Sequence, residues 1–144
     1  MVQLYRLTHP TSTVYADYRK TRSDYLGAAV LRQKGAELAQ KVGWNQWYVV
    51  LSKEVAHDYL LADQWDRAEQ QLQQLLKDMA TLDKVPLRDQ VQVRYYLGQL
   101  QSRRGATADG IQTYQKGIAM ARSAGDSSLM FSGLMGLGLS YFLN

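Results

Sequence analysis

Two stretches of the chain nearly repeat each other: Gln33-Lys-Gly-Ala-Glu-Leu-Ala-Gln-Lys-Val-Gly-Trp44 and Gln115-Lys-Gly-Ile-Ala-Met-Ala-Arg-Ser-Ala-Gly-Asp126. Half of the offset between their residue numbers is 41, which carries Ala39 onto Ala80 and Ala80 onto Ala121. An internal period of this size is typical of arrays in which each repeat is one pair of helices. The spacing therefore predicts that Ala39, Ala80 and Ala121 hold equivalent buried positions.

Apolar residues around this repeat recur at steps of three and four, the period that gathers side chains on one helical face. This pattern predicts helices over residues 45–61, 66–82, 87–104 and 108–124. Gly43, Gly105 and Gly125 follow expected helix ends, where glycine accepts the left-handed conformation that closes a helix. Both prolines, Pro10 and Pro86, fall between helical stretches. We therefore expect an all-α chain.

Length and composition indicate one globular domain. The chain has 144 residues, 46% of them hydrophobic and 21% charged, which is enough for a hydrophobic core. We expect a flexible segment over residues 1–12 and one helical domain over residues 13–144. The absence of cysteine excludes disulfides and thiolate chemistry. The start of the chain lacks the apolar core of a secretory signal, so we expect a cytoplasmic protein.

Small and aromatic residues at set places give the chain a resemblance to the tetratricopeptide repeat family. Leu97-Gly98 with Gly105, Gly110 and Tyr114 resembles the family pattern, and so does Leu137-Gly138 with Tyr141. The resemblance implies a right-handed α-α superhelix of about three helix pairs with an unpaired C-terminal helix. The long repeats are similar to those of bacterial regulators and peptide sensors, which implies a scaffold or adaptor in signalling or transcription.

Groups for catalysis or metal binding do not gather in the sequence. His9 and His57 are the two histidines, and neither has a second histidine three or four positions away, as helical metal ligands require. Gly133, Gly136 and Gly138 lie in an apolar helical stretch with no lysine after them, which favours helix packing over a phosphate loop. We expect no enzyme activity, no cofactor and no metal site.

The resemblance implies a concave groove lined by the first helix of each pair. With Ala56, Gly98 and Gly138 taken as equivalent, the groove rows are Val50, Lys53, His57 and Leu60; Gln92, Tyr95, Gln99 and Arg103; and Ser132, Met135, Leu139 and Phe142. The cations Lys53 and Arg103 suit an amphipathic segment or one that carries carboxylates. We expect a protein or peptide ligand there.

The C-terminal stretch predicts a second contact surface. Residues 127–144 contain no charge and place apolar side chains around most of a helix. Solenoid ends need a covering element to stay in solution. We expect a homodimer, or docking to a downstream domain, through Leu134, Met135, Leu139 and Phe142.

The excess of positive charge lies near the N-terminus and supports an alternative function. The net charge is +4, and residues 1–41 hold seven Lys or Arg against three Asp or Glu. The alternative function is nucleic-acid binding through a basic face. This face would consist of Arg19, Lys20, Arg22, Arg32, Lys34 and Lys41. A solvated helix face explains these residues better, so nucleic acid is not the expected partner.

Overall fold

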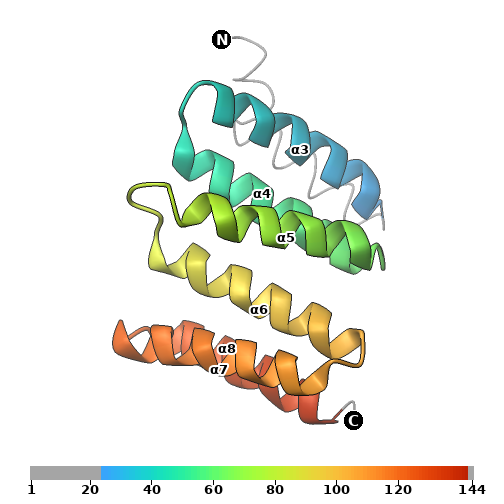
Figure 1. Ribbon diagram of the computed structural model, residues 1–144, viewed down its shortest axis with the longest axis vertical. Helices are drawn as coiled ribbons and strands as arrows, with labels where there is room; N and C mark the ends of the chain where they lie inside the picture. Colours follow the sequence, from blue (N-terminus) through green and yellow to red (C-terminus); the bar gives the residue numbers. More distant parts are fainter. Residues whose placement is uncertain (1–23, 143–144) are drawn as a thin grey trace. The chain divides into compact units, whose positions relative to one another are not determined.

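The computed structural model describes residues 24–142, and this part of the chain is all-helical. Its helices are α3 (Tyr25–Lys41), α4 (Asn45–Leu61), α5 (Trp65–Met79), α6 (Leu87–Arg103), α7 (Thr107–Ser123) and α8 (Ser127–Phe142) (Figure 1). The predicted all-α class is confirmed, and the helices lie close to their expected bounds. No helix in residues 24–142 has the length and apolarity needed to cross a bilayer.

The chain divides into two compact units between Val85 and Pro86. The first unit contains α3, α4 and α5, and the second contains α6, α7 and α8. The expected segment 1–12 lies outside the described residues. A single domain over residues 13–144, and a superhelix that runs through both units, stay predictions.

In the first unit α4 is the central helix, because both α3 and α5 pack on it. Its buried residues therefore lie on more than one face, and they include Val49, Leu51, Val55, Ala56 and Leu60. On α5 the buried residues Ala68, Leu72 and Leu75 follow one another at steps of four and three, which places them on a single face toward the core.

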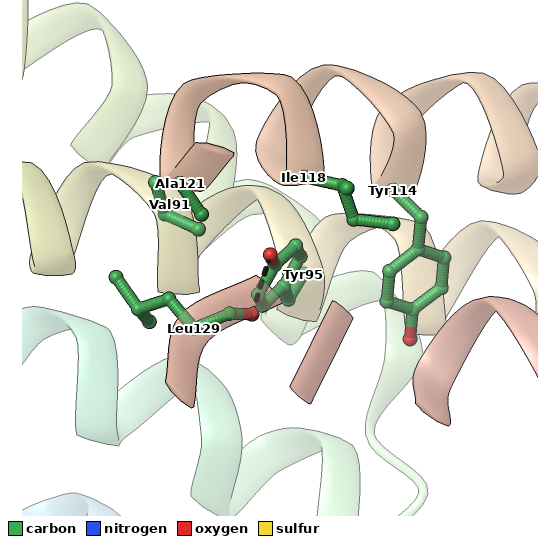
Figure 2. Packing of buried hydrophobic residues seen from close by; sticks show 6 residues of the cluster. All are labelled: Val91, Tyr95, Tyr114, Ile118, Ala121 and Leu129. Carbon is green, nitrogen blue, oxygen red and sulfur yellow. Dashed lines mark hydrogen bonds between the residues drawn. The ribbon is translucent and has the colours of Figure 1, made fainter. Parts of the chain in front are cut away.

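In the second unit α7 packs on both α6 and α8. The core cluster takes residues from all three helices: Val91 and Tyr95 from α6, Tyr114, Ile118 and Ala121 from α7, and Leu129 from α8 (Figure 2). The cluster joins the three helices into one packed body.

Residues with positive φ angles make the tight turns between paired helices. Gly43, Gly105 and Gly125 have φ angles of 75°, 85° and 70°. At the end of α4 the same role falls to Asp63, with φ 56°. Residues other than glycine rarely adopt positive φ angles, so the geometry strongly favours glycine at the other three turns. The predicted helix stops at Gly43, Gly105 and Gly125 are confirmed.

The expected register at Ala80 is wrong. Ala39 and Ala121 are fully buried, whereas Ala80 follows the last residue of α5 and is exposed. The second helices of the pairs begin at Tyr25, Trp65 and Thr107, so one step of the repeat is shorter than the next. The two unequal steps add up to twice 41 residues, so Ala39 and Ala121 still match each other. Counted from the start of its own helix, Met79 holds the place that Ala39 and Ala121 hold in theirs.

Candidate functional site: a groove between α6 and α8

A groove of about 400 Å³ lies between α6 and α8 in the second unit. Its lining comes from α6, from α8 and, through one tyrosine, from α7: Gln92, Tyr95, Tyr96, Gln99, Ser102, Arg103, Tyr114, Ser132, Met135, Gly136, Leu139 and Ser140. The groove therefore lies within one compact unit and is formed by its three helices.

Glycine residues allow the ring of Tyr114 to reach the groove between α6 and α8. A Cβ atom at Gly98 would lie 2.9 Å from the Tyr114 ring, and one at Gly136 would lie 2.5 Å from it. Both distances are too short for carbon atoms in contact, so only glycine fits beside this ring. The sequence thus places Tyr114 by leaving space for it on both neighbouring helices.

Hydrogen bonds fix the walls of the groove. The Ser102 hydroxyl of α6 donates to the Ser140 hydroxyl of α8 at 2.8 Å, and Ser140 donates to the Gly136 carbonyl at 3.0 Å. Since Ser102 and Ser140 both line the groove, their bond holds α6 and α8 together beside it. The side walls are therefore fixed before any ligand arrives, which lowers the entropic cost of binding.

The phenol of Tyr95 holds the inner side of α6 against the start of α8. Its hydroxyl donates to the Leu129 carbonyl at 2.8 Å, the dashed line in Figure 2. The Tyr95 and Tyr114 rings are tilted with centroids 5.7 Å apart, a favourable geometry for aromatic pairs. Tyr95 is 7% exposed, so it forms the floor of the groove and not its rim.

The groove carries one positive charge. Burial raises the pKa of Tyr114 to about 12, although Arg103 lowers it and Tyr95 adds a further rise. Burial, and then the charge of Asp126, raise the pKa of Tyr95 as well. Both phenols are therefore neutral at pH 7. Arg103, at the C-terminal end of α6, is the single charged residue among those that line the groove.

Two of the three predicted rows meet at this groove. Gln92, Tyr95, Gln99 and Arg103 line it from α6, and Ser132, Met135 and Leu139 line it from α8. Met135 and Leu139 were also expected in a self-association surface, whereas Leu134 and Phe142 do not line the groove and are exposed. Sequence reasoning missed Tyr114 and Ser102, although Gly98 with Tyr114 was already part of the quoted pattern.

The first predicted row lies on α4 in the other unit, and two of its four residues are buried. Leu60 is fully buried, Lys53 is 6% exposed, and His57 is half-buried with its Nδ1 3.9 Å from Glu54. Lys53 and Leu60 therefore have little exposed surface, and their place in a groove stays a prediction. The reason for their burial is the central place of α4, which leaves it little free surface.

Arg32 is not part of a basic surface. Its Nη1 lies 3.0 Å and 2.8 Å from the two carboxylate oxygens of Asp58, and the side chains of Arg32 and Asp58 are 3% and 0% exposed. This buried ion pair joins α3 to α4. Nucleic-acid phosphates could not reach Arg32. Of the other residues of that predicted surface, Lys34 and Lys41 are exposed, and Arg19, Lys20 and Arg22 lie outside the described residues.

Two further features bear on the site. A second cavity of about 350 Å³ in the first unit is mainly polar, with glutamines from α3 and α5 around the Tyr48 and Asp78 hydrogen bond. No group of three or more His, Asp or Glu residues in the described chain is placed to hold a metal ion.

Comparisons with known proteins give no family for the chain. A scan against protein-family models finds no match, and a search of curated proteins finds no similar sequence.

Proposed function

We propose that this chain is a non-enzymatic adaptor of the tetratricopeptide-like type, which binds a peptide segment of another protein in the groove between α6 and α8. The observation that carries the proposal is the groove itself, with a volume of about 400 Å³, fixed walls and mixed chemistry. Pockets of this size, lined by apolar and aromatic groups with a few polar ones, are typical ligand sites.

The lining supports a particular kind of segment. Met135 and Leu139 offer apolar surface on one wall, and Gln92 and Gln99 offer amide donors and acceptors on the other. Arg103 offers a guanidinium, which binds carboxylates with two parallel hydrogen bonds. We therefore expect a peptide with one or two apolar side chains and a carboxylate beside them. A cytoplasmic role in signalling or transcription is part of this proposal.

The test is selection followed by measured affinity. The purified chain is used to select binders from a displayed library of random peptides, and the affinity of the best peptide is measured by fluorescence anisotropy. Arg103→Glu should weaken an acidic peptide about tenfold or more, because a favourable charge becomes a repulsive one. The matched control is Arg104→Glu, which makes the same charge change at an exposed residue outside the groove lining.

A second variant tests the apolar wall. Leu139→Ser should lower the affinity while circular dichroism stays that of the native chain, since Leu139 is 58% exposed and contributes little to the core. Equal losses from Arg103→Glu and Arg104→Glu would show that overall charge, and not the groove, governs binding. A library that yields no binder at about 100 μM protein would contradict the proposed function.

A further inference from the structure

The helices α6 and α8 hold the same place in the repeat. They begin at Leu87 and Ser127, and the offset between these two starts also carries Gly98 onto Gly138. Residues of α6 that meet α7 therefore have counterparts on α8. A Cβ at Gly117 of α7 would lie 2.6 Å from the Tyr95 ring, and the α8 counterpart of Tyr95 is Met135.

The counterparts on α8 are exposed. Met135 is 55% exposed and Phe142, the counterpart of Ser102, is 85% exposed. A Cβ at Gly138 would have no atom within 4 Å, whereas one at Gly98 would collide with Tyr114. The face of α8 that in α6 receives a neighbouring helix thus receives none from the described residues.

Four residues of this face have the spacing of a two-helix contact. Phe131, Leu134, Gly138 and Tyr141 follow one another at steps of three, four and three, which is the seam of a pair of packed helices. We call these four residues the outer face of α8. The helix contains no charged residue, so covering this face removes no charge from water.

We propose that the outer face of α8 binds the same face of a second copy of this chain, in an antiparallel helix pair. In that register Leu134 of each copy lies over Gly138 of the partner subunit. The open space at Gly138 accepts this side chain as Gly98 accepts the ring of Tyr114. Phe131 then packs against Tyr141 of the partner subunit. The same contacts occur twice, as a twofold axis requires.

The exposed area matches what a dimer needs. Phe131, Leu134, Tyr141 and Phe142 are 65%, 49%, 59% and 85% exposed. With about 200 Å² for a large apolar residue, these fractions amount to roughly 500 Å² in each copy. A stable dimer buries about 800 Å² in each partner, so these four residues supply the larger part.

Sedimentation and light scattering of the full chain test the proposal. At about 50 μM we expect a mass of twice 16.4 kDa. Leu134→Glu with Phe142→Glu should raise the dissociation constant about 100-fold or more, since each copy would bury two unpaired charges. The matched control is Leu26→Glu with Val30→Glu, two exposed apolar residues of α3 at 42% and 54%, which should leave the dimer unchanged.

A glycine variant separates a lost dimer from a damaged fold. Gly138→Leu meets no atom of its own chain at the Cβ, so helicity should be retained, yet it fills the space for Leu134 of the partner subunit. We expect about tenfold weaker association. A wild-type monomer at about 50 μM, or a dimer indifferent to Gly138→Leu, overturns the proposal. If the chain is a monomer and binds a peptide of residues 107–123, then the outer face of α8 is covered by a helix that resembles α7 and not by a second copy of the chain. Arg103→Glu should not change the mass, so this test is independent of the peptide groove.

Discussion

The two units solve the same packing problem with different chemistry. Arg32 is the eighth residue of α3 and Tyr114 is the eighth residue of α7, so they hold equivalent places in the repeat. Arg32 pairs with the buried carboxylate of Asp58, whereas Tyr114 fits its ring against glycines of the neighbouring helices. The repeat spacing therefore determines which positions are buried, and the local partners decide whether charge or shape fills them.

The helix position of Asp58 is also filled differently in the two units. Asp58 is the fourteenth residue of α4, and the fourteenth residues of α6 and α8 are Leu100 and Ser140. All three are buried, with exposed fractions of 0%, 1% and 2%. One position thus accepts a carboxylate, an aliphatic side chain or a hydroxyl. At these positions the first unit pairs two charged side chains, and the second packs the Tyr114 ring against glycines.

Removing one member of the ion pair should have the largest effect on stability. Asp58→Ala leaves the Arg32 guanidinium buried without its carboxylate, and such a loss costs about 3–5 kcal/mol of unfolding free energy. Arg32→Met with Asp58→Leu removes both charges and supplies the aliphatic residue that α6 already has in Leu100. We expect this double variant to regain most of the stability. Urea unfolding at pH 7 measures both.

The comparison is contradicted if Asp58→Ala costs less than about 1 kcal/mol, since the pair would then be no more than an exposed one. A double variant as unstable as Asp58→Ala would show that the shape of the pair, and not its charge balance, matters in the first unit.

Two glycines of α8 give an internally matched test of packing by shape. Gly136→Ala places a Cβ 2.5 Å from the Tyr114 ring and should cost about 1–3 kcal/mol through overpacking. Gly138→Ala meets nothing within 4 Å and should raise the stability of the monomer by up to about 1 kcal/mol through helix propensity. Thermal unfolding at a dilution that keeps the chain monomeric measures both. Equal shifts for the two variants would mean that Tyr114 is not held by glycine.

The sequence predicted what depends on local spacing. Steps of three and four located the helices, and Gly43, Gly105 and Gly125 marked their ends because a positive φ angle leaves few alternatives to glycine. The rows on α6 and α8 followed from the equivalence of Gly98 and Gly138, and all of their residues except Phe142 line the same groove.

Pairing between distant residues was not predictable from the same signals. Arg32 and Asp58 lie on different helices, and nothing in either helix distinguishes them from solvated charges. Ala80 was misplaced because a single period averages two unequal steps between helix starts. The burial of Lys53 and Leu60 was not foreseen either, since the central position of α4 depends on how three helices pack and leaves no mark in its own sequence.

Alkaline titration gives the smallest effect and compares one tyrosine from each unit. Burial raises the pKa of Tyr48 to about 12, and its hydrogen bond to Asp78 adds to that rise, whereas burial raises the pKa of Tyr114 to about 12 without a carboxylate partner. An unfolded chain loses these protons near pH 10, so above that pH the folded state binds more protons than the unfolded state. Stability therefore falls as pH rises from about 10 to 12. At about pH 10.5 the loss in unfolding free energy is at most about 1 kcal/mol per tyrosine.

Tyrosinate absorbance of single Tyr→Phe variants assigns each phenol. Asp78→Asn should move the pKa of Tyr48 down and leave that of Tyr114 unchanged. Arg103→Gln should move the pKa of Tyr114 further up and leave that of Tyr48 unchanged, because Arg103 favours the phenolate of Tyr114. If Asp78→Asn left the pKa of Tyr48 unmoved, burial alone would hold both phenols neutral. The contrast between the charged pair of the first unit and the glycine packing of the second would then not extend to their tyrosines.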